Sequence, residues 1–470
     1  MSHTDPDRQH PMLTLAVLAT AGLAFALLQS LVAPALPEIQ RDLGISETTA
    51  TWILTSYLIS ASVATPIFGR LGDMYGKERL LLVSLGLLGV GTLISALSST
   101  AGPLIAGRVV QGAGGGIFPL AFGIIRDEFP RERVPGSIGL MSAILGIGGG
   151  AGIVLAGVIT DNLGYHWLFW IPLVTVVAAA VATWRWVPES PLKSPGRVDW
   201  VGAFVLAVGL VCVLLGVSET STWGWGSPKT IGLVLAGLAV LAAWVVLEKR
   251  VRDPLVDMDV MRIRGVWTTN VVAVLVGFGM YSSFILIPQL VEQPKSTGYG
   301  FGASVTATGI YMLPSTLMML LVGPLAGRVD RRFGSKRALL VGAAFSAASY
   351  ALFAAAHDQR WEIYLGSALL GTGIGLSFAA LANLTVAAVP QEHTGVATGI
   401  NTIARTIGGG FGTQVVATVL ATGVILGHPS ESAFTTAFGI SAVVLVLAIF
   451  AGLAIPGRRT ADALVPVAAR

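Results

Sequence analysis

The sequence predicts an all-α integral membrane protein with fourteen transmembrane helices, arranged as two six-helix bundles plus two extra helices. Three observations favour this fold class. The 470-residue chain carries 29 Lys+Arg and 25 Asp+Glu, so only 11% of its residues are charged, about half the share usual in soluble domains, whereas 54% are hydrophobic. Apolar segments long enough to span a bilayer follow one another along the chain, and part of the first half recurs in the second. This composition argues against a soluble enzyme, a disordered chain and a nucleic-acid-binding protein.

A helix crosses the hydrocarbon core of a bilayer in about 20 apolar residues. The predicted spans are 13–34, 50–68, 80–98, 103–125, 137–160, 166–187, 200–217, 230–247, 266–291, 303–327, 338–356, 362–389, 396–426 and 434–455. The first span is longer than the apolar core of a signal peptide, and a cleavage site of small residues does not follow it. We therefore expect it to remain in the mature protein.

The distribution of basic residues predicts the orientation. With a cytoplasmic N-terminus, 23 of the 29 lysines and arginines fall in inner segments, four in outer loops and two within spans. Cytoplasmic loops carry such an excess of basic residues. Arginine outnumbers lysine 23 to 6, which favours a GC-rich bacterial gene. We expect a multi-pass protein of the bacterial cytoplasmic membrane with both termini in the cytoplasm.

An internal repeat divides the chain. Gly69-Arg70 recurs as Gly327-Arg328, 258 residues later. At an offset of 259, four further glycines, at 107, 112, 114 and 136, recur at 366, 371, 373 and 395. The repeat predicts an N-terminal bundle (1–190), a linker with two extra spans (191–262) and a C-terminal bundle (263–470). Parallel repeats of this kind build transporters with a substrate site at the repeat interface; the alternative is a duplication with only a packing role.

The loop between the second and third spans contains Gly69, Asp73, Gly76, Lys77 and Arg79. Its glycines permit a tight turn and a close approach of helices. The aspartate can pair with a cation or cap a helix, and the two basic residues anchor the cytoplasmic face. We expect this loop to act as a gate; the alternative is a basic loop with an incidental aspartate.

The fourth span contains Arg108, Gln111 and Gly112. An arginine within a span costs at least about 2.5–3.5 kcal/mol, so it is expected to face the bundle interior and find acceptors there. The alternative is that it lies near the outer end of the span and reaches the membrane surface. The fifth span is rich in glycine and includes Gly148, Gly152 and Gly157. We interpret it as a bendable hinge helix against which a neighbour can slide.

These motifs resemble those of the major facilitator superfamily, and the resemblance covers almost the whole chain. The loop 69–79 is similar to the superfamily's signature loop, which locks the two halves in the outward-facing state. The segment 108–114 is similar to the second motif, whose arginine is linked to proton coupling. The segment 152–157 resembles the exporter motif Gly-Pro-x-Leu-Gly-Gly, although Ile153 replaces the proline and Ala156 replaces a glycine.

Two further segments place the chain nearest the fourteen-span drug:proton antiporters. The end of the first span, 33–39, and Trp167-Leu168-Phe169-Trp170 at the start of the sixth are similar to those of that family. Many of its members carry an aspartate in the first span, where this chain has Gln29. By analogy, we expect the substrate cavity to be lined by Gln29, Tyr57, Tyr281, Phe284, Gln289, Tyr311, Asn383, Asn401 and Arg405. Each of these residues alone also fits a packing role.

The charges within the spans bear on the substrate. Carboxylates are absent from the middle of the spans; the nearest are Glu38, Glu219 and Glu292, all at outer span ends, where each also fits an exposed loop. The two charges inside spans, Arg108 and Arg405, are positive. If both face inward, neutral or anionic substrates are favoured over lipophilic cations; the alternative for Arg405 is a bond to helix carbonyls.

We therefore expect a secondary active transporter that exports small lipophilic drugs or antibiotics by alternating access, coupled to proton entry. The alternative within the same superfamily is a proton-independent facilitator or an importer of a small metabolite. A membrane enzyme or sensor would need a catalytic cluster or a soluble domain, which the sequence does not suggest. The six histidines have no metal-binding spacing, Cys212 stands alone, and no phosphate-binding loop occurs in the sequence. We expect no metal and no cofactor, a proton gradient as the energy source, and a monomer.

Overall fold

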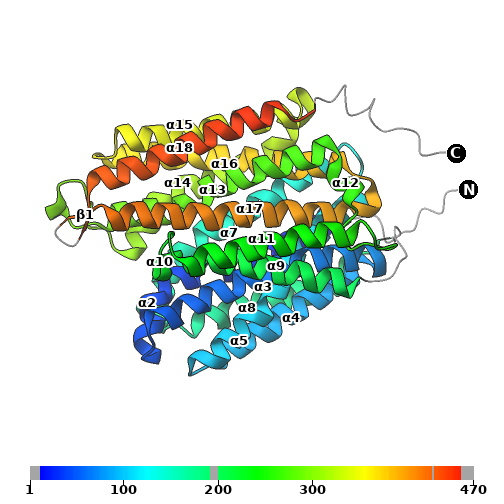
Figure 1. Cartoon of the computed structure of the whole chain (residues 1–470), viewed down its shortest axis with the longest axis horizontal. Coiled ribbons are helices and arrows are strands. Elements are labelled where there is room, and N and C mark those ends of the chain that lie inside the picture. The colour runs from blue at the N-terminus through cyan, green and yellow to red at the C-terminus, as the bar shows by residue number, and fades with distance from the viewer. Residues whose placement is uncertain (1–10, 191–198, 426–427, 457–470) are drawn as a thin grey trace, which may run out of the picture.

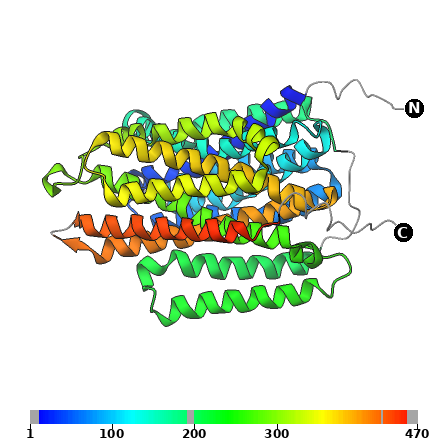
Figure 2. The same cartoon turned by 90° about the horizontal axis from the view of Figure 1, so that it is seen from above.

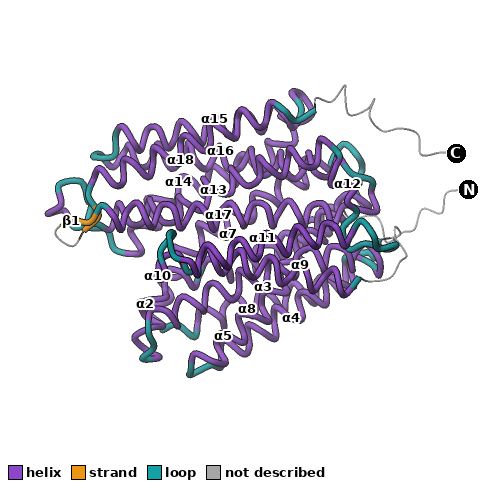
Figure 3. The backbone as a smooth tube through the Cα atoms, viewed as in Figure 1, coloured by secondary structure: helices purple, strands orange, loops and turns teal. Residues whose placement is uncertain are grey.

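The computed structural model describes residues 11–190, 199–425 and 428–456, and most of this chain is helical. Long helices run side by side between two ends of the molecule (Figure 1). At one end α1 (Pro11–Ser30) begins and α18 (Glu431–Leu453) finishes; we call this the terminal end. The opposite, far end carries a small antiparallel hairpin of β1 (Val424–Ile425) and β2 (His428–Pro429), seen in orange in Figure 3.

The first half continues with α2 (Val32–Leu43), α3 (Glu47–Tyr75), α4 (Lys77–Leu97), α5 (Ala101–Gln111), η2 (Gly112–Gly116), α6 (Ile117–Glu128), α7 (Val134–Leu163) and α8 (Trp167–Trp186). Two predicted spans are interrupted. The first breaks at Leu31 because the ring of Pro34 clashes with a carbonyl one turn earlier. The fourth passes through η2, a 3-10 segment composed of glycines and one alanine, because glycine is a poor α-helix former.

The middle segment contains α9 (Trp200–Ser218), α10 (Thr220–Trp223), α11 (Pro228–Glu248) and α12 (Met258–Arg262). The second half contains α13 (Arg264–Glu292), η3 (Lys295–Thr297), α14 (Val305–Phe333), α15 (Ser335–Ala355), α16 (Arg360–Ala388), η4 (Gln391–His393), α17 (Thr394–Thr422) and α18. Helices α3 and α14 extend beyond their predicted ends at 68 and 327. Their last turns are polar, which lowers hydropathy but does not prevent helix formation.

The all-α membrane fold predicted from the sequence is confirmed. Thirteen helices in the described part of the chain are long and apolar enough to cross a membrane. The remaining predicted span coincides with α17, which is 29 residues long but contains many threonines together with Asn401 and Arg405. Its glycines pack closely against α13, at Gly408 beside Val274 and at Gly412 beside Phe278, so α17 lies within the bundle.

Two large hydrophobic cores are present, one made mainly of residues 15–187 and one of residues 272–455. A third, smaller core joins α9 and α11 to α3 and α17. This extra pair lies at the edge of the molecule (Figure 2). The domain boundaries at 190 and 262 stay predictions, and parts of those ranges (1–10, 191–198 and 457–470) lie outside the described residues.

The repeat seen in the sequence reappears as paired contacts between the halves. Gly69 of α3 lies against Gly395 of α17, so close that a Cβ on Gly69 would lie 2.6 Å from the Gly395 carbonyl oxygen. Gly327 of α14 lies against Gly136 of α7, where a Cβ would lie 2.5 Å from the Gly136 Cα. Because Gly69 matches Gly327 and Gly136 matches Gly395, the two contacts are related by the pseudo-twofold axis that the repeat predicts.

Candidate functional site

The motif loop lies at the terminal end, where α3 turns into α4. Gly76 joins the two helices with φ 117°, a conformation that side chains other than glycine rarely adopt. A Cβ at this position would also collide with the carboxylate of Glu189. Gly69, two turns earlier, permits the close approach of α3 to α17. A side chain at either position would clash with neighbouring atoms, so the local packing requires glycine at both.

Asp73 links the two halves. Its Oδ2 accepts hydrogen bonds from the backbone N–H groups of Gly395 (3.1 Å) and Val396 (3.3 Å), in the first turn of α17. The side chain is buried, with a residue exposure of 1%. The first N–H groups of a helix lack partners within the helix, and its N-terminus carries partial positive charge. A carboxylate from one half thus caps a helix of the other, and we call this contact the Asp73 latch.

A buried cation supports the latch. Lys77 Nζ lies 3.4 Å from Asp73 Oδ1 and 2.7 Å from Asp127 Oδ2, and all three side chains are at most 1% exposed. Ser190 donates a further hydrogen bond to Asp127. In contrast, Arg79 pairs with Glu189 at 3.3 Å while its own side chain is 70% exposed. Exposed pairs contribute little, whereas removing one partner of a buried pair is costly.

A second set of polar contacts crosses between the halves beside the latch. Arg126 of α6 donates to the carbonyl oxygens of Val389 and Pro390 and, at 2.6 Å, to the Thr394 hydroxyl. Asn383 of α16 donates to the carbonyl of Pro135 at 3.3 Å. Asn383, predicted to line the cavity, is thus a contact between the halves at the terminal end. His393, at the start of α17, is partly buried, which lowers its pKa and favours the neutral ring.

Arg108 is fully buried among helices of the first half. Its Nε donates to the carbonyl of Ile53, and its Nη1 donates to the carbonyl of Leu28 and to Gln111 Oε1 at 2.7 Å. The guanidinium also lies 4.1 Å above the ring of Tyr57. Gln111 donates onward to the Thr92 hydroxyl. This placement agrees with the expectation that Arg108 faces the interior rather than the membrane surface.

A small cavity lies at the interface of the two halves. Its volume is about 30 Å³, room for water but not for a drug-sized molecule. Among its polar lining residues are Gln29, Ser62, Tyr281, Thr402, Arg405 and Thr406. Gln29 of α1 donates to the Tyr281 hydroxyl of α13 at 3.2 Å, a bond between the halves. Three of the nine predicted cavity residues therefore meet here.

Arg405 is the charged residue of this lining. Its guanidinium lies 4.3 Å from the ring centroid of Phe378, and the residue is 7% exposed. Within the described residues, no carboxylate lies within ion-pair distance of Arg405, and none lines the cavity. Arg108 is not among the lining residues, so only one of the two arginines gives the cavity positive charge.

The other predicted cavity residues lie elsewhere in this state. Phe284 makes an edge contact with Tyr281, next to the cavity, and Tyr57 lies beneath Arg108. Tyr311 stacks on Tyr364, with ring centroids 5.2 Å apart, inside the second half. Asn401 pairs with Asn270 of α13, and Gln289 is exposed on the same helix. These residues were predicted to line one cavity because residue type alone does not show which face of a helix a side chain occupies.

The glycine-rich helix α7 is continuous over 30 residues and makes close contacts on both sides. Gly148 lies against Ala26 of α1, and Gly152 lies against Ser30, whose hydroxyl donates to the Gly148 carbonyl at 2.7 Å. Gly157 is buried farther along the same helix. A hinge role for these glycines stays a prediction.

Sequence reasoning missed several residues at the interface of the halves. Arg126 was counted only as a basic loop residue, although it bonds to the second half. Ser62, Thr402 and Thr406 line the cavity but carry no motif. A hydroxyl on a transmembrane helix also bonds to its own helix backbone, as Ser62 does to Leu58, so hydroxyls in a sequence do not signal a cavity.

The chain matches the Major Facilitator Superfamily over residues 18–413. Among its relatives is the tetracenomycin C resistance and export protein of Streptomyces glaucescens, 29% identical over 421 residues (89% of this chain, 77% of that protein). Multidrug resistance protein 3 of Bacillus subtilis is 26% identical, covering 84% of this chain and 77% of its own. The multidrug resistance protein Stp of Mycobacterium tuberculosis is 27% identical, with 87% and 76% covered.

Two crystal structures share the fold at low sequence identity. The human organic anion transporter MFSD10 (TETRAN) superposes with a TM-score of 0.65 at 16% identity, covering 96% of this chain and all of the other. The POT family transporter PepTSo superposes with a TM-score of 0.62 at 17% identity, covering 97% and 99%. The chain is therefore a multi-pass membrane transporter that belongs to the Major Facilitator Superfamily.

Proposed function

We propose that this protein is a secondary active exporter that moves small lipophilic compounds out of a bacterial cell by alternating access, in exchange for protons. The relatives named for drug resistance and antibiotic export support this direction of transport. The bias of basic residues supports a place in the cytoplasmic membrane with both termini inside. The terminal end is then the cytoplasmic end. The proposed transporter acts as a monomer.

The Asp73 latch carries the proposal. It joins the halves at one end only, by directional hydrogen bonds between a carboxylate and a helix N-terminus. The central cavity in the same state is too small for a drug-sized molecule. Binding of a substrate therefore requires the halves to move apart, and passage to the cytoplasmic side requires the latch to break. Alternating access is the motion that does both.

Arg405 indicates the substrate class. It brings a positive charge to the cavity, and no carboxylate of the described residues neutralises it there. A buried, unpaired cation attracts acceptor oxygens and anions and repels other cations. Neutral compounds rich in carbonyl oxygens and organic anions fit this cavity better than lipophilic cations.

The test uses full-length protein in liposomes that contain a pH-sensitive dye, with an imposed proton gradient and neutral, anionic and cationic drugs. We expect neutral or anionic drugs to trigger proton movement opposite to their own. Arg405→Gln should abolish the preference against cations, and Arg108→Lys should reduce proton movement. Arg360→Gln, which changes an exposed arginine, serves as the matched control.

The alternative function is a facilitator or an importer. Drug flux without proton movement would assign a facilitator, and proton and drug movement in the same direction would assign an importer. A substrate profile limited to cations would contradict the role given to Arg405 while leaving the exporter proposal standing.

A further inference from the structure

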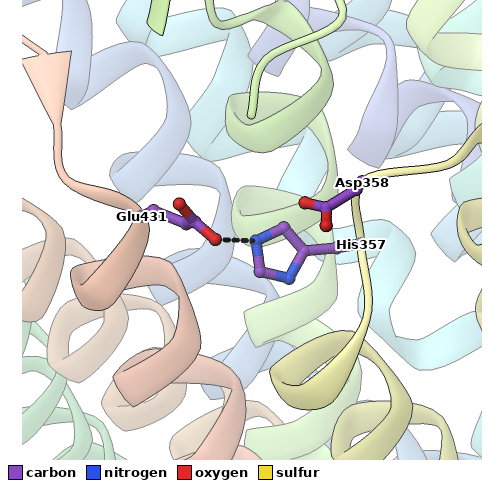
Figure 4. A group of neighbouring side chains, drawn as sticks. All are labelled: His357, Asp358 and Glu431. Carbon is purple, nitrogen blue, oxygen red and sulfur yellow. Dashed lines mark ion pairs between the residues drawn. The ribbon is translucent and has the colours of Figure 1, made fainter. Parts of the chain in front are cut away.

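Three side chains from separate parts of the second half meet at the far end of the molecule. His357 and Asp358 lie in the loop that follows α15, and Glu431 is the first residue of α18 (Figure 4). One nitrogen or oxygen atom from each residue lies within 4.8 Å of those of the other two. The fold brings Glu431 to a histidine 74 positions earlier in the chain, which the sequence spacing does not reveal.

The hydrogen bonding of His357 determines which ring nitrogen is free. Its Nδ1 lies 2.6 Å from the carbonyl oxygen of Phe353, in the last turn of α15. A carbonyl oxygen can only accept, so Nδ1 carries the proton and donates it. In the neutral ring Nε2 then has a lone pair. Histidines that bind metals show this pattern: one ring nitrogen donates to a carbonyl or carboxylate and the other faces the metal.

The free nitrogen is buried and faces the carboxylate of Glu431. His357 is 4% exposed, and its Nε2 has no hydrogen-bond partner in the part of the chain that the structure describes. It points toward Glu431, whose Oε1 is 3.8 Å away, beyond hydrogen-bond distance (Figure 4). A lone pair and a carboxylate that face each other are mutually repulsive, and a cation placed between them removes the repulsion.

We propose that His357, Asp358 and Glu431 bind a divalent transition-metal ion, with Zn²⁺ as the representative case. One imidazole and two carboxylates are donors that Zn²⁺ accepts, at about 2.0–2.2 Å from each atom. Tetrahedral coordination at these lengths places donor atoms about 3.3–3.5 Å apart. The two carboxylate side chains need to move inward by only a fraction of an ångström to at most about 1.5 Å, and both residues are exposed and free to do so. Water completes the coordination.

The site would tie the α15–α16 loop to the start of α18. Both elements belong to the second half, so the metal would stabilise its far end without bridging the two halves. The proposal is independent of the exporter function, since none of its residues lines the central cavity or contributes to the Asp73 latch. Its failure would leave the transport proposal untouched.

The experiment measures Zn²⁺ binding to untagged, full-length protein in detergent after removal of metal with EDTA. Calorimetry gives the stoichiometry and affinity, and Co²⁺ used in place of Zn²⁺ reports nitrogen and oxygen ligation by its visible absorption. The variants are Glu431→Gln, Asp358→Asn and their double variant, which preserve side-chain size at exposed positions. His166→Gln, in the α7–α8 loop, and Asp42→Asn, in the last turn of α2, are the matched controls at the far end of the first half.

We expect the native chain to bind one more equivalent of Zn²⁺ than the double variant. Each single variant should bind this equivalent at least about tenfold more weakly than the native chain. The controls should match the native chain. Mg²⁺ should not compete, because it prefers oxygen ligands. Equal stoichiometry and affinity in the native chain and the double variant would overturn the proposal, as would effective competition by Mg²⁺. If the native chain and the variants have equal melting temperatures in EDTA, misfolding is excluded as the cause of any loss of Zn²⁺ binding.

Discussion

The two seams between the halves are built from different chemistry. Along α7 and α14 the contact is made by glycines at successive levels, with Gly136 against Gly327, Ala143 against Gly323, Gly150 against Thr316, and Val154 against Gly309. Between α3 and α17 the closest contacts are at the terminal end, where Gly69 meets Gly395 and Asp73 bonds to the start of α17.

This difference separates two tasks. A seam of small residues is held by close packing, which has no directional bonds and survives small rotations of one helix against the other. The Asp73 latch is directional and buried, so it is either formed or broken. In the proposed alternating-access cycle, we therefore expect the glycine seam to keep the halves together and the latch to determine which state of the transporter is populated. The position that matches Asp73 at the repeat offset of 258 is Arg331, so the sequence does not repeat the latch.

The largest effect should come from the cation beneath the latch. Lys77→Met leaves Asp73 and Asp127 without their buried partner, and we expect a loss of about 3–5 kcal/mol in the free energy of unfolding. Arg79→Met, which breaks a largely exposed pair two residues away, should cost about 1 kcal/mol or less. Detergent-induced unfolding followed by tryptophan fluorescence measures both. Similar losses in the two variants would show that Lys77 does not hold the latch.

Matched alanine substitutions should distinguish the two seams. Gly327→Ala overpacks the α7–α14 seam and is expected to cost about 1–3 kcal/mol of stability. Gly69→Ala is equally crowded, but the tightest α3–α17 contact lies near the terminal end, so the halves can relieve it by separating there, whereas the tight α7–α14 contacts continue along both helices. We expect Gly69→Ala to lose less stability and to widen the mouth between the halves at the terminal end, which is the proposed cytoplasmic end.

Electron paramagnetic resonance distances between spin labels at Arg131→Cys and Gln391→Cys, in a Cys212→Ser background, measure that mouth. A distance that Gly69→Ala leaves unchanged, or that Gly327→Ala increases to the same extent, would contradict the division of tasks.

Removing only the charge of the latch should have a smaller effect. Asp73→Asn keeps the side-chain volume but loses the interaction of a carboxylate with the N-terminus of α17. We expect about 1–2 kcal/mol, a shift of roughly 5–30-fold toward the state open to the cytoplasm. Asp330→Asn is the control, because Asp330 accepts from Ser335 within its own half. The same spin-label pair gives the populations, and an equal shift in both variants would refute a role specific to Asp73.

The smallest effect concerns the far end of α17, where the extra helices contact it. Trp225 donates to the Thr418 hydroxyl at 2.7 Å and stacks on Phe411. Trp225→Phe keeps a ring but removes the donor, so we expect a loss of about 0.5–1 kcal/mol in stability and little change in the latch. Hydrogen exchange of the α17 backbone measures local opening. Opening that spreads to the latch would mean that the two ends of α17 are coupled.

The sequence predicted the elements of the latch but not its partner. Asp73 and Lys77 were identified from one short loop, because glycine and charge patterns at helix ends are local signals. The acceptor site on α17 lies 322 residues away and consists of backbone N–H groups, which no residue type encodes. The repeat offset indicated that Gly69 and Gly327 occupy equivalent positions. It did not reveal that Gly69 contacts Gly395 and that Gly327 contacts Gly136, two glycines that also match each other at the repeat offset.

The substrate cavity was harder to predict than the fold. Gln29, Tyr281 and Arg405 line one cavity, whereas Tyr311 lies in an aromatic stack of the second half; that this cavity binds substrate stays a prediction. A span hydrophobic on all sides gives no helical periodicity that separates its lipid-facing, packed and cavity-facing sides. The breaks at Leu31 and in η2 were also absent from the sequence prediction, since hydropathy measures length and not backbone geometry.

The position of the extra helices has a consequence for lipophilic compounds dissolved in the bilayer. Ala203 and Leu206 of α9 belong to one apolar cluster with Val63 of α3 and Ile403 of α17, so α9 covers the α3–α17 seam from its lipid side. The α7–α14 seam is closed by tight packing, because a Cβ at Gly327, Gly323 or Gly309 would lie 2.4–2.5 Å from an atom of α7. In this state, sideways passage from the membrane interior through either seam is blocked. Under the proposed function, a compound that binds at Arg405 must therefore enter along the long axis of the bundle, starting from the water–membrane boundary.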